Sequence, residues 1–183
     1  MTRAAVAPIV GLVCRLALAV ILGWAGLAKL IEPLVALQAV QAYELLPESL
    51  VPVVGYGLPL LEVALALFLL VGLLTRPVAI AVIVVMLAFI AAVASAWARG
   101  LSIDCGCFGG GGQIAPEQTR YVEEILRDLG FILLAGWLVL RPITRWSLDG
   151  RYAADHDEAT DEGGDEDEDG PIGAEGTEET TAR

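Results

Sequence analysis

Charged residues are scarce in this sequence of 183 residues, and they are unevenly placed. Only 19% of the residues are charged, whereas 56% are hydrophobic and the mean hydropathy is +0.68. A soluble domain has about a quarter charged and about 45–50% apolar residues. Here, long blocks with almost no charged residues alternate with short segments that contain charged residues, which is typical of membrane-spanning helices. This composition excludes a soluble globular enzyme and a nucleic-acid-binding protein.

Histidine and cysteine are also rare, which limits metal chemistry. The sequence has one His, His156, and three Cys, of which Cys105 and Cys107 lie one residue apart. Two thiolates with no His nearby do not complete a tetrahedral zinc site, so we predict no zinc centre. A soft ion such as Cu(I), held by the two sulfurs, remains an alternative. Cys14 lies far from the pair in sequence, and we expect it to be a packing residue.

The net charge of −12 belongs to the C-terminal tail. Residues 153–183 carry 13 acidic residues and one Arg, so the first 152 residues hold ten charges of each sign. The tail is nearly empty of large apolar residues, so we predict that it is disordered. Asp165–Gly170 begins like an EF-hand loop, but Gly176 stands where the calcium-binding Glu is needed. We therefore predict a membrane domain over residues 1–152 and a solvated acidic tail over 153–183.

Four apolar blocks predict an all-α fold, an integral membrane four-helix bundle in the lipid bilayer. Each block is long enough to cross the hydrocarbon core, which takes about 20 residues. The last block is the least certain span, because four charged residues occupy its first two turns. We interpret the first block as a retained span rather than a cleaved signal peptide, because Arg15 interrupts it. The blocks are Ala4–Ile31, Val51–Leu74, Pro77–Ala98 and Tyr121–Leu140.

The distribution of Lys and Arg predicts the orientation in the cell (inner) membrane. With four spans both termini lie on one side, and five basic residues flank the membrane there, against three on the other side. We therefore predict cytoplasmic termini and extracytoplasmic loops at Glu32–Leu50 and Arg99–Arg120. The two groups are Arg3, Arg76, Arg141, Arg145 and Arg151, and Lys29, Arg99 and Arg120.

The segment Asp104–Gly109, with the sequence Asp-Cys-Gly-Cys-Phe-Gly, is the main candidate for chemistry. Disulfides form and persist on the outward side of the membrane. In a fully extended chain the two Cα atoms would be about 7 Å apart, beyond the usual disulfide limit, so the chain must turn at Gly106. A strained bridge exchanges readily and closes too short a loop to stabilise a fold. Cys105 and Cys107 are therefore predicted to be a redox pair.

Two ionisable residues within the predicted spans are candidate supporting residues, because such residues are often functional. Glu62 and Arg127 are predicted to lie roughly 10 Å and 9 Å deep from the outer side, counting about 1.5 Å per residue. Opposite charges at matching depth predict an ion pair across the bundle, with Lys29 and Glu32 at the outer mouth of the first span. Such pairs often serve only to hold a bundle together. In the functional alternative, Arg127 favours a cysteine thiolate and Glu62 moves a proton.

Aromatic residues gather near the predicted outer interface, where an aromatic belt explains them without a cofactor. No cofactor is evident from the sequence, but a quinone stacked among these rings is a possible electron sink. The residues are Trp24, Tyr43, Tyr56, Trp97 and Tyr121.

Several segments together resemble the MauE branch of the DoxX-like membrane proteins, over roughly residues 10–145. They are Gly23–Lys29, Tyr43–Pro47, Pro59–Glu62 with Gly72, Asp104–Gly109 and the dipeptide Arg127-Asp128. The Cys-Gly-Cys-Phe-Gly sequence is the most specific of them. The resemblance implies a four-helix integral membrane protein. It also implies a role in methylamine utilisation, in which a thioredoxin-like partner helps to mature the disulfide-rich small subunit of methylamine dehydrogenase.

The sequence therefore predicts thiol–disulfide exchange with an extracytoplasmic thioredoxin-like protein, in support of the maturation of exported proteins. Only one cysteine pair is predicted to face outward, so the electron sink is expected to be a quinone or a protein. Two alternatives stay open: a copper-binding or copper-transport component, and a non-catalytic membrane assembly factor. The sequence does not identify which cysteine attacks.

Overall fold

The computed structural model describes residues 3–141 of the chain, and side chains from residue 7 onward. These residues belong to one compact unit, residues 1–151. The predictions for the acidic tail, including its EF-hand-like segment, lie outside the described residues.

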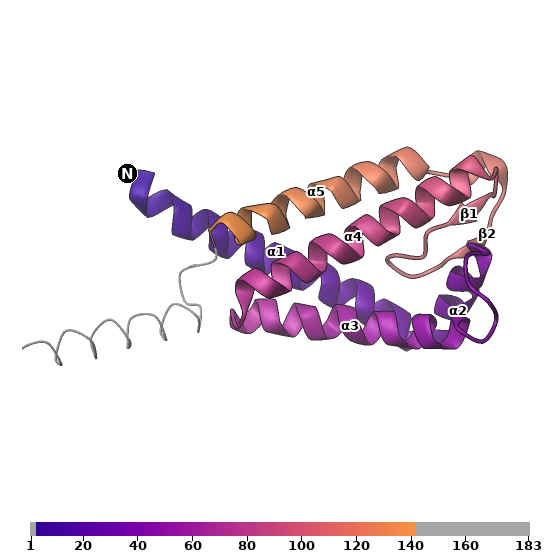
Figure 1. Cartoon of the computed structure of the whole chain (residues 1–183), viewed down its shortest axis with the longest axis horizontal. Coiled ribbons are helices and arrows are strands. Elements are labelled where there is room, and N and C mark those ends of the chain that lie inside the picture. The colour runs from indigo at the N-terminus through magenta and orange to yellow at the C-terminus, as the bar shows by residue number, and fades with distance from the viewer. Residues whose placement is uncertain (1–2, 142–183) are drawn as a thin grey trace, which may run out of the picture. The chain divides into compact units, whose positions relative to one another are not determined.

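Four long helices run along the unit and two smaller features lie at one of its ends (Figure 1). The long helices are α1 (Arg3–Ile31), α3 (Val51–Val71), α4 (Thr75–Ala98) and α5 (Tyr121–Leu140). The shorter elements, which come between the long helices in the sequence, are the helix α2 (Pro33–Ala42), the strands β1 (Ile103–Asp104) and β2 (Gly112–Gln113), and the 3₁₀ turn η1 (Pro116–Gln118). The predicted all-α class and its four long helices are confirmed.

Proline and glycine set several helix ends. Pro33 occupies the first turn of α2, where the missing N–H of proline costs no helical hydrogen bond. Gly72 ends α3 in the left-handed conformation, with φ of 72°, and its N–H bonds to the carbonyl of Phe68. This is the usual glycine C-cap, and it lets α4 begin three residues later.

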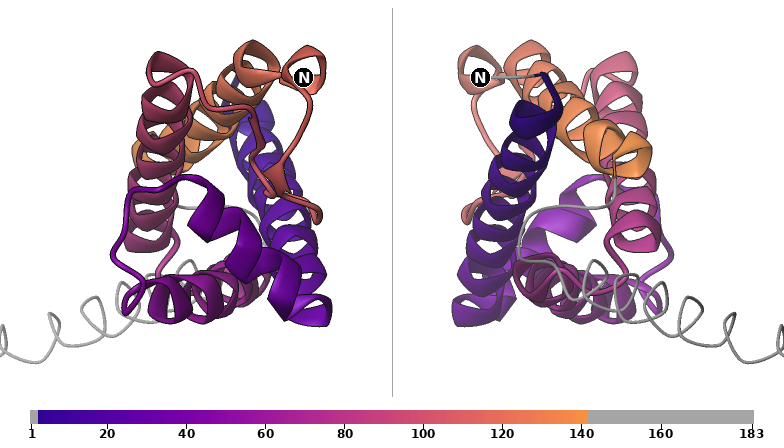
Figure 2. Two further views of the ribbon diagram at one scale, coloured as in Figure 1. Left: turned by 90° about the vertical axis from the view of Figure 1, so that its right-hand side faces the viewer. Right: turned by 90° about the vertical axis from the view of Figure 1, so that its left-hand side faces the viewer.

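The core lies where the four long helices meet. Leu18 of α1, Leu69 of α3, Val82 of α4 and Leu138 of α5 are all completely buried. Helix α1 packs mainly against α3, and α4 packs mainly against α5, whereas α3 and α4 contact each other sparsely. Figure 2 shows the helices around this common interior, viewed from the two ends. Cys14 is buried in the same core, as predicted.

Among the described residues, three helices are long and apolar enough to cross a membrane: Ala7–Ile31, Val51–Val71 and Thr75–Ala98. Helix α5 does not meet the same criterion, because of the charges in its first turns. Its most buried charged residues, however, point into the bundle: Glu124 and Asp128 are only 7% and 2% exposed. Its outward stripe is apolar apart from Glu123, and consists of Val122, Leu126, Leu129, Leu133, Trp137 and Leu140. Helix α5 therefore offers lipid a surface similar to that of the other three.

Part of the outer loop predicted over Glu32–Leu50 is the helix α2. The prediction missed it because a ten-residue helix is too short to show as a span. Helix α2 packs against α3 and against the hairpin of β1 and β2, in which Ile103 pairs with Gln113 and Asp104 with Gly112. Together, α2 and the hairpin cover one end of the bundle.

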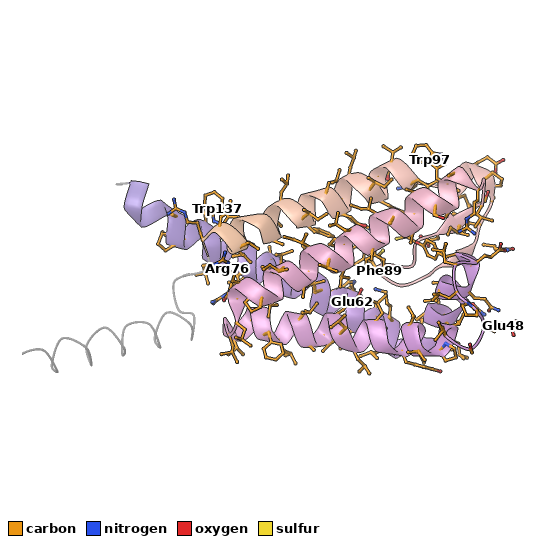
Figure 3. All side chains as sticks on the ribbon, in the orientation of Figure 1. Glu48, Glu62, Arg76, Phe89, Trp97 and Trp137 are labelled. Atoms are coloured by element: carbon orange, nitrogen blue, oxygen red, sulfur yellow. The ribbon has the colours of Figure 1, made fainter. Side chains whose placement is uncertain are left out.

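The side chains distinguish the interior of the bundle from its ends (Figure 3). Glu62 and Phe89 lie in the interior, along the middle of the long helices. Trp97 and Glu48 lie at the end that carries the hairpin, and Arg76 and Trp137 lie at the opposite end. Trp97 is 53% exposed, as expected of a residue in an aromatic belt.

Candidate functional site: a cysteine pair above the bundle

Tyr121, the first residue of α5, anchors the hairpin that carries the cysteines. Its hydroxyl donates to the carbonyl of Leu101 and accepts the N–H of Ile103 at 3.1 Å. Its ring contacts that of Trp97, with the centroids 6.1 Å apart. Tyr121 is 7% exposed, so it serves this anchor rather than the predicted aromatic belt. The chain entering the cysteine segment is thereby held against both α4 and α5.

The two cysteines come together because the chain turns between them. Gly106 has φ of +68°, the left-handed conformation that glycine adopts most easily. The turn lets the N–H of Cys107 donate to the sulfur of Cys105 at 3.3 Å. Both side chains are free thiols and are 8% exposed. The predicted turn at Gly106 is confirmed.

Close packing of glycines against α2 fixes the position of this turn. A Cβ atom on Gly106 or on Gly111 would lie 2.8 Å or 2.5 Å from the Cβ of Ala39. Both glycines have positive φ, so they provide the backbone conformation and the close approach together. The cysteine segment is therefore seated on α2.

Arg127 of α5 faces the cysteine pair, as the functional alternative predicted. Its Nη2 atom lies 3.6 Å from the sulfur of Cys105. Its Nε and Nη2 both donate to Oδ1 of Asp128 at 3.1 Å, and its guanidinium lies over the ring of Phe108, 5.0 Å from the centroid. The cation is thus shared among a thiol, a carboxylate and an aromatic face.

These contacts make the two thiols unequal. The pKa of Cys105 is lowered, first by the hydrogen bond from the Cys107 thiol and also by that from Arg127, although burial opposes the shift. The pKa of Cys107 is raised well above its ordinary value by its hydrogen bond to Cys105 and by burial. In the reduced pair, Cys105 is therefore the thiol that ionises more readily, and Cys107 is the one that holds its proton more tightly.

Glu62 does not pair with Arg127, so that prediction is wrong. Both of its carboxylate oxygens lie 2.8 Å from Nζ of Lys29, and the pair is buried. The residue count placed Glu62 and Arg127 at similar depth but did not show which side chain each would face. Glu62 still shares the wall of a small cavity, of about 20 Å³, with Cys107 and Arg127.

Of the two carboxylates beside Cys105, Asp104 was noted from the sequence and Glu124 was missed. Asp104, Cys105 and Glu124 bring one oxygen, the sulfur and another oxygen within 4.8 Å of one another. Oε2 of Glu124 is buried and has no hydrogen-bond partner among the described residues. These groups could hold a metal ion, but Arg127 places a positive charge on the same sulfur and disfavours a second cation. The spacing of Tyr121, Glu124 and Asp128 on one helical face was the signal that could have revealed Glu124.

The pair opens outward into a polar depression of about 420 Å³. Cys105 and Cys107 both line it. The charged residues around it are Asp104, Arg120, Glu123, Glu124 and Arg127. Both cysteines are only 8% exposed, so this depression is the side from which a peptide thiol or disulfide would approach them.

Comparison with known proteins agrees with this architecture. Residues 7–141 match the family model of the methylamine utilisation protein MauE. The chain belongs to the MauE family. It is also 37% identical over 105 residues to the methylamine utilization protein MauE of Paracoccus denitrificans.

That match covers 57% of this chain and 56% of the relative, so it spans about half the length of the curated protein. No solved structure matches the chain. The MauE match includes every long helix and the cysteine segment, and together with the apolar helices it makes this chain a multi-pass membrane protein. The match to the family model ends before the acidic tail.

Proposed function

We propose that this MauE-family protein exchanges thiols and disulfides with an extracytoplasmic thioredoxin-like protein, and so supports the maturation of exported proteins in methylamine utilisation. The contact of 3.6 Å between Arg127 and the sulfur of Cys105 is the observation on which the proposal rests. A cation beside a thiol stabilises the thiolate, which is both the nucleophile and the better leaving group in exchange.

The exchange proceeds between a partner dithiol and the Cys105–Cys107 bridge. A partner thiolate attacks the bridge at Cys107, and Cys105 leaves as the thiolate that Arg127 stabilises. The second partner thiol then attacks the partner sulfur of the mixed disulfide and displaces Cys107, which takes up the proton that this thiol loses. Two partner S–H bonds are lost and one partner disulfide forms, while the bridge gains the two electrons and becomes a dithiol.

Trapping of the mixed disulfide tests this mechanism. Cys105→Ser and Cys107→Ser should each accumulate a mixed disulfide through the remaining thiol, seen as a higher-mass band that reductant removes. Cys14→Ser is the matched control and should trap nothing. If the Cys105→Ser/Cys107→Ser double variant matures the exported partner as well as the parent does, exchange is wrong and the assembly-factor alternative takes its place.

The proposed orientation has both termini in the cytoplasm and the cysteine segment outside. The excess of Lys and Arg that the sequence predicts on the side of the termini, and the apolar outward face of α5, support this orientation and four crossings. In a Cys14→Ser background, reduced intact cells should label at Cys105 with a membrane-impermeant thiol reagent. Labelling that appears only after permeabilisation would reverse the orientation.

Copper binding is the second candidate, because the two thiols are the soft ligands that Cu(I) prefers and the carboxylates of Asp104 and Glu124 lie beside Cys105. Titration of the reduced protein with Cu(I) distinguishes the two functions. Stoichiometric binding that Glu124→Gln weakens, with no loss of partner maturation in that variant, would favour copper. Exchange instead predicts that maturation depends on both cysteines and that Glu124→Gln leaves the trapping pattern unchanged.

A further inference from the structure

A second cavity lies behind the cysteine pair, on the side facing the bundle. Its volume is about 350 Å³, which is within the range of small-molecule sites. Its walls are almost entirely apolar, and they come from α1, α2, α3, α4 and the cysteine turn. Only three of its lining side chains carry polar or thiol groups: Lys29, Tyr43 and Cys105. The cavity therefore suits an apolar molecule with one or two polar atoms.

Tyr43 marks where such a polar atom would bind. The residue is 8% exposed, and its hydroxyl is buried with no hydrogen-bond partner among the described residues. A buried hydroxyl without a partner is costly, so a ligand oxygen that accepts its proton would remove that cost. Lys29 uses two of its three N–H donors on Glu62, which leaves one for an acceptor. Both groups call for a carbonyl-type ligand.

The cavity is reached from the lipid side. Val54, Leu58 and Pro59 of α3 and Val85, Ala88 and Phe89 of α4 line it, and these two helices contact each other sparsely. Ala88 lies on the cavity wall and is also exposed. A cavity of about 150 Å³ already holds a benzene ring, so this one has room for a substituted ring and the start of a chain.

Cys105 connects the two cavities. It lines the outer polar depression, where the partner is proposed to bind, and it lines the inner apolar cavity as well. Cys107 lines only the outer of these two. The sulfur that Arg127 contacts is therefore the one that adjoins an inner ligand.

We propose that the inner cavity binds the ring of a membrane quinone, which reoxidises the cysteine pair. This inference rests on the proposed thiol exchange and supplies its electron acceptor. The S–S bond of the Cys105–Cys107 bridge forms and two S–H bonds are lost. The two electrons and two protons pass to the quinone oxygens, which yields one quinol per bridge.

The test uses the purified full-length protein, reduced and then freed of reductant, without oxygen. The probes are a decyl-substituted benzoquinone and a short-chain naphthoquinone, both fully substituted on the quinone ring so that they cannot alkylate thiols. We expect at least one of them to remove two thiols per quinol formed, as counted by alkylation mass shift and by quinol absorbance. The two probes show which ring the cavity accepts. The double Cys→Ser variant should form no quinol.

Two pairs of variants locate the site. Ala92→Phe fills the cavity, whereas Ala91→Phe adds the same ring one residue away at an exposed position of α4. Quinone reduction should slow at least tenfold in the first and stay unchanged in the second. Tyr43→Phe should raise the KM for quinone roughly three- to tenfold, the worth of one hydrogen bond. The reaction of the cysteine pair with a small water-soluble disulfide should be unchanged in Tyr43→Phe. If the substitution merely disturbed the structure around the cysteines, this reaction would slow as well.

The outcomes separate this inference from the proposed function. If the pair exchanges with the water-soluble disulfide but neither quinone oxidises it, the quinone inference is wrong and exchange stands. If the pair reacts with neither, the proposed function is wrong as well. If quinone oxidises the pair equally fast in Ala92→Phe and Ala91→Phe, the ring binds elsewhere.

Discussion

Two cations within the described helices, the buried Lys29 and the partly buried Arg127, are held in opposite ways. Lys29 is bound by both oxygens of one carboxylate, Glu62, each at 2.8 Å. Arg127 is shared among Asp128, the ring of Phe108 and the sulfur of Cys105. The first cation is matched by one full opposite charge, whereas the second has a carboxylate on one side and an ionisable thiol on the other.

The difference indicates which site does chemistry. In the Lys29–Glu62 pair the two charges already balance, so a new negative charge nearby would stabilise it little. The pair therefore contributes mainly to holding α1 against α3. A shared cation can strengthen its contact with sulfur when the thiol ionises, so the free energy of the site changes with the redox state. Intramembrane charge alone therefore does not identify the reactive residue, and the division of its contacts does.

The largest effect we predict is the loss of stability when the Lys29–Glu62 pair is broken. Glu62→Met leaves a buried ammonium without its carboxylate and should lower the free energy of unfolding by about 3–5 kcal/mol. Unfolding by sodium dodecyl sulfate in mixed micelles measures it. The Lys29→Met/Glu62→Met double variant should recover most of the loss, since an apolar pair needs no desolvation of charge.

Glu32→Met is the matched control for this prediction. It removes a carboxylate that is exposed, three residues after Lys29. It should change the free energy of unfolding by less than about 0.5 kcal/mol. Equal losses in Glu62→Met and Glu32→Met would show that the buried pair is no more important than surface charge.

The second effect concerns the seat of the cysteine segment on α2. Gly106 and Gly100 have nearly the same backbone, with φ of +68° and +70°, but a Cβ at Gly100 would meet nothing within 4 Å. Gly100→Ala should cost about 1–2 kcal/mol from the left-handed conformation alone. Gly106→Ala should cost about 1–3 kcal/mol more, because its Cβ would overlap that of Ala39.

Ala39→Gly combined with Gly106→Ala tests this cause. Removal of the Ala39 Cβ should recover most of the additional loss, as measured by the same unfolding experiment. If Gly106→Ala and Gly100→Ala cost the same, the segment is not held by its contact with α2, and the position of the thiols needs another explanation.

The long helices were predictable because apolar runs and turn residues mark them. The fourth block has the predicted bounds, Tyr121–Leu140, and the third begins two residues earlier than predicted, at Thr75. Helix α2 was not predicted, because a short helix between two spans lacks a span's signal. The number of residues between a side chain and the end of its helix can be counted from the sequence, and this count gives the depth of the side chain in the bundle.

The pairing of side chains was not predictable in the same way. Counting residues assigns a depth to Glu62 and Arg127, but the rotation of each helix and the choice of neighbours depend on packing. Lys29 was expected at the mouth of the first span, but its pairing with Glu62 was not predicted. Tyr43 was assigned to an aromatic belt, although α2 buries it beside the cysteines. The cysteine pair and the role of Arg127 were predictable, whereas the places of Glu124 and Tyr43 beside the pair required the tertiary structure.

The third effect is on the reactivity of Cys105. Its pKa is lowered in part by Arg127, so Arg127→Met should raise that pKa and shift the pH profile of alkylation to higher pH. A smaller fraction of Cys105 is then ionised, so alkylation near pH 7 should slow roughly tenfold, which corresponds to the loss of one hydrogen bond to a charged group. Mass spectrometry of Cys105 after iodoacetamide treatment at several pH values measures this. Arg120→Met removes a mostly exposed cation at the rim of the outer depression and should have little effect.

The smallest effect tests the third contact of Arg127, the aromatic ring. Phe108→Leu removes the face over which the guanidinium lies at 5.0 Å, a contact worth about 0.5–1 kcal/mol at an exposed site. Alkylation of Cys105 near pH 7 should slow roughly two- to fivefold, because the cation is then free to turn toward Asp128. Phe89→Leu removes the equivalent ring beside Lys29, at 5.8 Å, and should leave the rate unchanged because the Lys29–Glu62 pair does not contact the thiol. A cation shared among several partners must respond to the loss of any of them, whereas one fully paired with a carboxylate must not. If Phe108→Leu speeds alkylation, or if Phe89→Leu slows it as much as Phe108→Leu does, the two cations do not differ in the way that their contacts indicate.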